Sequence, residues 1–237
     1  MVGDGELHGS PVAYATPAPG APEASAPGAR GDDRTVRPIA AELLSGVDLY
    51  RTVVLEKMAG ARESVWIATA NVKAMMVAQP GEQGRFAPVL SLFRTLARRG
   101  VELRLLHAEL PSRPFRRAFD RSRTLVEGGL QLKICPRVHF KCVRVDGAWV
   151  YLGSANLSGA GLGAKHADAR NFELGVVTED FDTIDRVTAL FESVWSGAEC
   201  GRCRLRSVCP DPIGPALPRA RKSDGIRLGR PRRLRRG

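Results

Sequence analysis

Apolar and polar residues follow two different periods along the middle of this chain. Apolar residues at helical spacing, or a high density of charge, predict helices at residues 49–61, 86–99, 114–127 and 181–195. Shorter runs rich in β-branched and other apolar residues predict strands at residues 63–72, 101–107, 130–135, 138–145, 148–152 and 171–178. Strands that alternate with helices, together with one hairpin, predict an α/β fold in which helices cover both faces of a mixed β-sheet.

The two ends of the chain differ in composition from this central part. Residues 1–36 are rich in Ala, Pro and Gly, and residues 213–237 are rich in Arg, so both are predicted to be disordered tails. A single folded domain is predicted over residues 37–198, followed by a cysteine-containing segment at 199–212. The sequence shows no apolar run of the ~18 residues that a membrane helix needs and no secretory signal, so we expect a cytoplasmic protein without stable membrane insertion.

The charge of the chain is strongly positive and is not confined to its end. Residues 219–237 contain nine Lys and Arg against one Asp, and residues 1–36 contain two Arg against five Asp and Glu. Because the whole chain carries +11, the residues between these tails carry a net +6. Such a balance indicates contact with a polyanion, first of all nucleic acid, although anionic lipid headgroups or a merely solvated tail would also fit.

One stretch carries most of the candidate chemistry. It reads H-x-K-x4-D-x6-G-S-x-N and comprises His139, Lys141, Asp146, Gly153, Ser154 and Asn156. His139 and Lys141 lie two residues apart in a predicted strand, so their side chains are expected on one face. Asp146-Gly147 predicts a hairpin turn, after which the return strand brings Ser154 and Asn156 back beside His139.

These residue types suit chemistry on a phosphodiester without a metal at the reacting centre. The imidazole of His139 can attack phosphorus and form a covalent phosphohistidine. Lys141, Ser154 and Asn156 can bind the non-bridging oxygens as negative charge builds up on them. A second imidazole must protonate the leaving oxygen and later activate water, and the ordinary imidazole pKa of ~6.5 suits both steps near neutral pH.

The stretch closely resembles the HKD motif of the phospholipase D superfamily, and the order of elements over residues 38–197 is similar to the fold of that superfamily. Many members carry an N-x-E segment on the following strand, which implies that Glu173 orients the nucleophilic histidine with support from Asn171. Asp146 belongs to the signature, and its position at a turn suggests a structural role. Members need two signatures and this chain has one, so the resemblance implies a homodimer that shares one active site.

A second set of residues predicts a metal site outside the reacting centre. The spacing C-x2-C-x5-C near the end of the domain comprises Cys200, Cys203 and Cys209. Clustered cysteines in a cytosolic chain more often bind metal than form disulfides, and a tetrahedral zinc or an iron–sulfur cluster needs a fourth ligand. Cys142 is the first candidate for that ligand, with Cys135 and His166 as rivals, and three free thiols are the alternative to any metal.

The sequence therefore predicts a hydrolase that acts on phosphodiester bonds. The leading hypothesis is a metal-independent nuclease that cleaves DNA or RNA, with no cofactor needed for catalysis. A phospholipase D or phosphatidyl transferase that acts on phospholipids is the alternative, because the signature permits both. A DNA-binding subunit that keeps the fold without activity is a third possibility, against which the intact signature argues.

Overall fold

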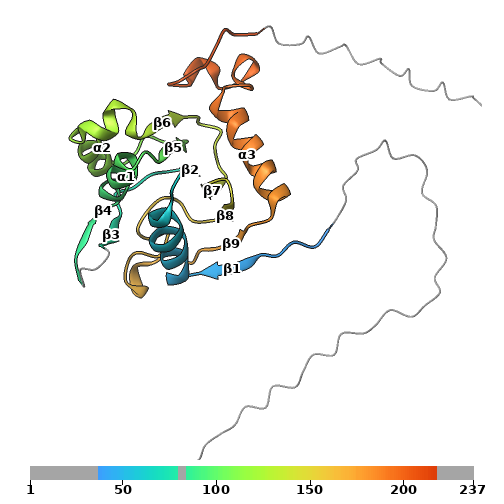
Figure 1. Ribbon diagram of the computed structural model, residues 1–237. Coiled ribbons are helices and arrows are strands. Elements are labelled where there is room, and N and C mark those ends of the chain that lie inside the picture. Colours follow the sequence, from blue (N-terminus) through green and yellow to red (C-terminus); the bar gives the residue numbers. More distant parts are fainter. Residues whose placement is uncertain (1–36, 80–83, 218–237) are drawn as a thin grey trace, which may run out of the picture. The chain divides into compact units, whose positions relative to one another are not determined.

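The structure is a computed structural model that describes residues 37–79 and 84–217 (Figure 1). The folded domain lies within the unit Pro38–Gly237. The predicted tail at residues 1–36 and most of the predicted tail at 213–237 lie outside the described residues.

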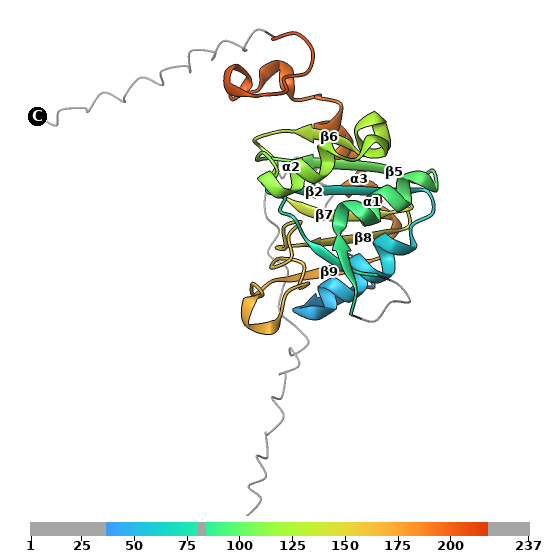
Figure 2. The same cartoon turned by 90° about the vertical axis from the view of Figure 1, so that its left-hand side faces the viewer.

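A seven-stranded mixed sheet forms the centre of the domain, as predicted (Figure 2). From one edge to the other its strands are β1 (Glu42–Ser45), β9 (Leu174–Thr178), β8 (Trp149–Gly153), β7 (Lys141–Val145), β2 (Ser64–Thr69), β5 (Glu102–His107) and β6 (Gln131–Ile134). Strands β2, β5 and β6 are parallel, whereas β7, β8, β9 and β1 each run antiparallel to their neighbours. A small second sheet pairs β3 (Met76–Ala78) with β4 (Phe86–Pro88).

Helices cover both faces of the large sheet, which confirms the predicted layers (Figure 1). The helices are η1 (Leu49–Met58), α1 (Val89–Arg98), α2 (Arg113–Asp120), η2 (Leu125–Gly129) and α3 (Phe181–Trp195). The first four pack around one large apolar cluster, and α3 packs on the opposite face around a smaller one. Alternate residues of β7 separate accordingly: Val143 and Val145 enter the large cluster, and Cys142 enters the small one.

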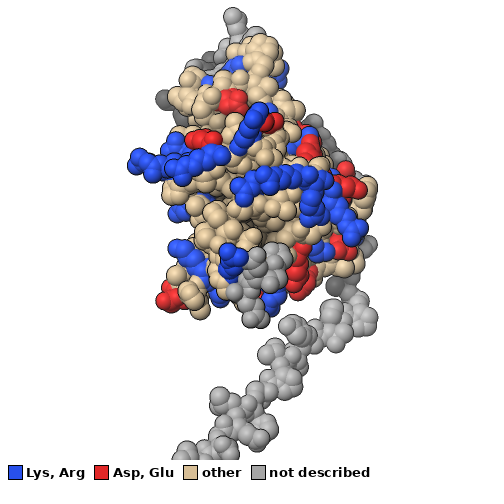
Figure 3. Space-filling view, turned by 60° about the vertical axis from the view of Figure 1, so that its left-hand side comes forward, with Lys and Arg blue, Asp and Glu red and all other residues tan. Residues whose placement is uncertain are grey.

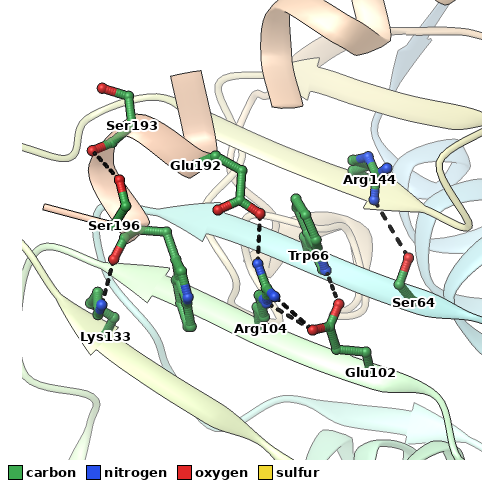
Figure 4. Close-up of polar contacts among 10 residues, drawn as sticks. Ser64, Trp66, Glu102, Arg104, Lys133, Arg144, Glu192, Ser193 and Ser196 are labelled. Carbon is green, nitrogen blue, oxygen red and sulfur yellow. Dashed lines mark hydrogen bonds and ion pairs between the residues drawn. The ribbon is translucent and has the colours of Figure 1, made fainter. Parts of the chain in front are cut away.

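Helix α3 is held on the sheet by aromatic stacking and by ion pairs, of which Figure 4 shows the ion pairs. Its Phe191 stacks on Trp66 of β2, with 5.2 Å between the ring centroids. Arg104 of β5 lies 4.4 Å from the centroid of Trp66 and pairs with Glu192 of α3 at 2.7 Å and with Glu102 at 2.8 Å. Asp180 caps the start of α3 by accepting a hydrogen bond from the backbone N–H of Thr183 at 2.9 Å, as expected for an aspartate there.

The structure departs from the predicted elements in three places. The charged helix predicted at 114–127 is two segments, α2 and η2, and η2 ends where Gly128 adopts a φ of 106°. Strands β1 and β3 were not predicted, since three or four residues carry too little periodicity to detect, and β4 occupies the first three residues of the helix predicted at 86–99, which begins only at Val89. The strand predicted from residue 138 begins only at Lys141, so His139 lies in the loop before it. Among the described helices, none is long and apolar enough to cross a membrane.

Candidate active site

Four signature side chains, those of His139, Lys141, Ser154 and Asn156, lie at one end of the central sheet, where β2, β5 and β8 end and β7 begins. His139 is exposed and lies directly before β7, between the buried Val138 and the half-buried Phe140. Lys141 is the first residue of β7, and its Nζ donates a hydrogen bond to the backbone carbonyl of His139 at 2.7 Å. The nucleophile candidate and the nearest cation are therefore neighbours at the surface, as the spacing predicts.

Ser154 and Glu173 are joined at this same end. Gly153, the last residue of β8, pairs with Lys141 on one side and with Gly175 of β9 on the other. The hydroxyl of Ser154 donates to Glu173 Oε2, and Asn171 Nδ2 donates to Glu173 Oε1 at 3.1 Å. Among the described contacts of Glu173, none reaches the His139 ring, so the orienting role of this glutamate stays a prediction. Its carboxylate instead holds two neutral donors in place beside the site.

Asn156 has its two amide atoms in different environments. Its Oδ1 accepts hydrogen bonds from Thr69 Oγ1 at 3.1 Å and from the backbone N–H groups of Ala70 at 3.1 Å and Asn71 at 3.4 Å. These three donors fix the carbonyl side of the amide where β2 ends. The Nδ2 group points the other way and remains a donor for a ligand. Asn156 thus has two roles: its Oδ1 supports the loop after β2, and its Nδ2 is a donor whose position is fixed.

Asp146 lies at the opposite end of the hairpin, and its contacts there fit the structural role that its position at a turn suggests. It is five residues from Lys141 along β7, about 16 Å at the usual strand rise. Its carboxylate accepts from the backbone N–H groups of Arg62, Glu63 and Ser64 at 2.8 to 3.2 Å. Burial by itself raises the pKa of this carboxyl, but these hydrogen bonds and the Arg62 charge outweigh burial and lower the pKa. Asp146 ties the hairpin turn to the start of β2.

The turn itself has the geometry that its sequence predicts. Asp146 and Gly147 have φ angles of 51° and 67°, and the N–H of Ala148 donates to the carbonyl of Val145 at 3.1 Å. Positive φ at both central residues is typical of a type I′ turn, which aspartate and glycine tolerate. Asp146 therefore has a structural role: it adopts the positive φ that the turn requires, and its carboxylate binds the backbone at the start of β2.

Tyr151 is a buried residue that contacts the signature loop through Ala155. It was not identified from the sequence. It is 1% exposed, and its hydroxyl accepts a hydrogen bond from the N–H of Ala155 at 3.3 Å. A Cβ atom at Gly153 would come within 2.2 Å of that hydroxyl, and one at Gly175 within 2.3 Å of the ring. The glycine of the signature thus makes room for this ring. Burial raises the pKa of Tyr151 to about 12, and Glu173 adds to that shift.

A basic rim adjoins the site on the side of β2. Val72 forms a parallel bridge with Leu157, and the N–H of Lys73 donates to the carbonyl of Leu157 at 2.9 Å, so Lys73 lies beside the signature loop. Ser112, which precedes the arginine-rich helix α2, contacts the same segment by donating its N–H to the carbonyl of Val72 at 2.9 Å. Figure 3 shows Lys and Arg side chains gathered across the face of the molecule that includes α1 and α2.

Two further histidines are described in addition to His139. His107 ends β5 and is 4% exposed, and its Nδ1 lies 2.8 Å from the carbonyl oxygen of Glu109. Burial lowers the pKa of His107, which keeps its imidazole neutral within the core. His166 is exposed in the loop between Leu157 and Asn171. Neither ring has a described contact with His139, so among the described residues one chain does not pair two imidazoles at this site.

The structure corrects one of the predicted metal ligands, Cys142. Among residues 37–79 and 84–217, no group of three or more His, Cys, Asp or Glu side chains is placed as a preformed metal site, so a metal on Cys200, Cys203 and Cys209 stays a prediction. Cys142 is buried in the apolar cluster beneath α3, where burial raises its pKa to about 12. The cysteine that lies near the triplet is Cys135: burial raises its pKa, and the thiols of the triplet add to the shift.

Comparison with known proteins identifies one family and several similar folds. A family model described as cardiolipin synthase, PLD-like domain, matches residues 54–195, which is more than half of the chain. No curated protein matches. Among solved structures, NucT from Helicobacter pylori is 15% identical, with 66% of this chain and 95% of that chain covered and a TM-score of 0.47. Nuc from Salmonella typhimurium, titled a phospholipase D family member, is 17% identical with the same coverage and a TM-score of 0.44.

Proposed function

The chain belongs to the phospholipase D superfamily, and from this premise we propose that it is a metal-independent phosphodiesterase that cleaves nucleic acid. One observation carries the proposal. An exposed imidazole, an ammonium group and fixed neutral donors lie together at one end of the sheet, on His139, Lys141, Ser154 and Asn156. A phosphodiester needs a nucleophile and several donors for its oxygens, and this end of the molecule supplies both.

In the first step, one imidazole nitrogen of His139 attacks phosphorus and forms the N–P bond while the P–O bond to the leaving group breaks. The charge on the non-bridging oxygens is balanced by the ammonium group of Lys141 and by Nδ2 of Asn156. Ser154 adds its hydroxyl, held in place by Glu173. The ammonium group of Lys141 donates to the backbone carbonyl of His139 at 2.7 Å, and in the proposed mechanism it turns toward the bound phosphate.

The leaving oxygen needs a proton, and the phosphohistidine needs an activated water in the second step. An imidazolium supplies the proton, and the same imidazole then removes a proton from the water that breaks the N–P bond. His107 is buried and already contacts Glu109, so it does not suit this role. We therefore assign the second imidazole to His139 of another copy of this chain, which makes the active unit a homodimer.

An exposed apolar stripe beside the site supports this assembly. On the outer face of β9 and the residues before it, Phe172, Leu174 and Val176 are 109%, 58% and 37% exposed. Leu43 of the neighbouring edge strand β1 pairs with Val176 and is 68% exposed. Leu174 and Val176 alternate along β9, and Phe172 and Leu174 lie on either side of Glu173, so a copy that covers the stripe comes close to the site. The stripe would bury apolar surface that the single chain leaves in water.

The choice of nucleic acid over lipid rests on charge. The residues between the tails carry a net +6, Lys73 lies beside the signature loop, and Ser112, directly before the arginine-rich helix α2, contacts the same segment. A nucleic acid extends beyond the scissile phosphate, so such a rim binds its neighbouring phosphates. A phospholipid enzyme is the second candidate, favoured by the description of the matching family model and by the exposed Phe172.

The first experiment compares substrates in the presence of EDTA. Purified protein is incubated with single-stranded DNA, double-stranded DNA, RNA and phosphatidylcholine vesicles, each beside the His139→Asn variant. We expect the protein to cleave at least one nucleic acid. This cleavage should persist in EDTA and should be absent with the His139→Asn variant. Release of choline without nucleic-acid cleavage would favour the lipid enzyme, and binding of DNA without any cleavage would favour a non-catalytic subunit. His166→Asn serves as the control, because this exposed histidine lies outside the proposed machinery.

The second experiment tests the shared site. Wild-type chains are mixed with a growing excess of His139→Asn chains under conditions in which subunits exchange. Hybrid dimers lack one of the two imidazoles, so activity should fall below that of the same amount of wild type diluted in buffer. Activity that depends only on the amount of wild-type chain, together with a monomer in sedimentation, would contradict the dimer.

A further inference from the structure

A cavity behind the loop of His139 is lined by cysteines that the proposed reaction does not use. It has a volume of about 300 Å³ and lies between the loop after β6 and the segment after α3. Cys135 lines it from the loop, and Cys200 and Cys203 line it from the segment, together with Val138 and Phe140 on either side of His139. Arg137 Nη1 lies 3.9 Å from Cys203 Sγ, which brings the two chain segments into contact.

The segment after α3, which carries three cysteines, has an organised backbone. Short helical turns, η4 (Cys200–Arg202) and η5 (Arg206–Val208), separate them, and the N–H of Cys203 donates to the carbonyl of Cys200 at 3.2 Å. Arg206 Nη1 donates to the carbonyls of Cys200 at 3.2 Å and Ile213 at 3.0 Å, so one guanidinium group ties the segment together. This organisation is not explained by an apolar core, because no residue of either turn is buried.

The cavity places a fourth cysteine beside this triplet, because Cys135 lines it together with Cys200 and Cys203. Cys142 does not line the cavity and is 1% exposed in the apolar cluster beneath α3. Cys135 and the three cysteines of the triplet are all half-buried, whereas Cys142 is fully buried.

We propose that Cys135, Cys200, Cys203 and Cys209 bind one thiophilic metal centre, a zinc ion or an iron–sulfur cluster, that joins the His139 loop to the segment after α3. Four thiolates satisfy either centre without further ligands. The thiols are not arranged as a metal site as they stand, and a rotation about χ1 moves each sulfur, so binding draws them together. Nearby guanidinium groups of Arg137 and Arg206 offset the negative charge of the thiolates.

The position of this centre gives it a consequence for the active site. The N–H of Val138 donates to the carbonyl of Cys135 at 2.9 Å, so a turn of four residues leads from the metal ligand to the residue before His139. A centre that fixes Cys135 therefore fixes the loop that carries the nucleophile candidate. It is a positioning device, because it lies behind the loop and supplies no group to the reacting atoms.

The test is the metal content of the whole chain, measured without reference to activity. Protein purified without air is analysed for zinc and iron and by visible absorption. We expect about one zinc, or about four irons with a broad absorption band, per chain. Cys135→Ala and Cys203→Ala should lose the metal, and Cys142→Ala should keep it. Wild-type protein without zinc or iron would overturn the proposal, and so would full metal in Cys135→Ala or loss of metal in Cys142→Ala.

A second measurement covers the case in which a cysteine variant fails to fold. Wild-type protein is stripped with a chelator and then titrated with Co²⁺, whose thiolate complexes absorb in the visible and near-ultraviolet regions. A single saturating site with the absorption of four thiolate ligands supports the centre, and the absence of thiolate–cobalt bands in protein that is still folded contradicts it. Because both readouts are independent of substrate, their failure is distinguishable from failure of the proposed phosphodiesterase.

Discussion

The two ends of the β7–β8 hairpin carry signature residues that do different work. At one end His139 and Lys141 are accessible, and Asn156 keeps a donor that no described contact uses. At the other end the carboxylate of Asp146 is occupied by three backbone N–H groups. A short sequence signature thus combines a reactive set with a structural residue about 16 Å away along the strand. The spacing of the signature does not distinguish its reactive residues from its structural residue, whereas the hydrogen bonds in the structure do.

The largest effect is expected at the reactive end, from His139→Asn. Loss of the nucleophile should lower kcat by about 10⁴-fold or more, because every later step depends on the covalent intermediate. The side chain is exposed, so the melting temperature should change little. Steady-state rates in EDTA and a thermal melt check both parts. A variant that retains a tenth or more of the activity would exclude His139 as the nucleophile.

Asn156→Asp separates the two functions of one amide. The new carboxylate keeps an acceptor for Thr69, Ala70 and Asn71 but replaces the donor Nδ2 with an anion. We expect kcat to fall by about 10²–10³-fold with near-normal stability. Asn156→Ala should lower both, since it also releases the loop after β2. Equal loss of stability in the two variants would mean that Asn156 acts only as a structural residue.

Asp146→Ala should produce the reverse result at the structural end. Three backbone N–H groups lose their acceptor, so the free energy of unfolding should fall by about 1–3 kcal/mol while kcat of the folded protein stays the same. Asp146→Asn keeps one acceptor oxygen and tolerates the positive φ, so it should lose less. Chemical denaturation and steady-state rates below the melting temperature check this. A large drop in kcat without loss of stability would place Asp146 in the catalytic machinery.

The stability difference caused by Asp146 should also depend on pH. Because the pKa of this carboxyl is lowered in the folded protein, its contribution is complete above the unfolded value of about 3.9 and is lost as pH falls through the lower folded value. The gap between wild type and Asp146→Ala should therefore narrow below about pH 4. A gap that stays constant from pH 7 to pH 3 would mean that the charge of the carboxylate does not matter.

The smallest expected effect concerns binding outside the site. Deletion of residues 219–237 removes nine basic residues and one acidic residue. Affinity for DNA should decrease, and the dependence of log affinity on log salt should become shallower by about 0.9 for each phosphate that the tail neutralises in the full-length protein. Turnover of a small phosphodiester should stay unchanged. An identical salt dependence in both proteins would show that the tail is merely solvated.

The sequence predicted the sheet, its covering helices and the group of residues at the reactive end, because long apolar periods and the spacing of the signature are local information. It did not reveal Tyr151 or Thr69, whose roles depend on contacts between strands far apart in sequence. The prediction of Cys142 as a metal ligand was wrong for a similar reason. Alternation along β7 correctly placed it opposite Lys141, but only the packing of α3 shows that this face is a closed apolar cluster.

The residue at which β7 begins was also not predictable from the pattern of apolar residues. Residues 138–140 have the composition of a strand, yet pairing with β8 begins at Lys141 because Gly153 is the last residue of β8. His139 therefore lies in a loop, supported by the buried Val138 on one side. In that position the His139 side chain is exposed.

Trapping the covalent intermediate tests the role of His139 without relying on a variant's loss of activity. Wild-type protein is quenched during turnover of a slowly hydrolysed phosphodiester and digested at neutral to alkaline pH, and the peptides are analysed by mass spectrometry. We predict an acid-labile phosphoryl adduct on His139 that is absent from wild-type protein without substrate and from His139→Asn protein with substrate. Active protein that carries no adduct under these conditions, or carries it on another residue, would contradict the assignment of His139 as the nucleophile.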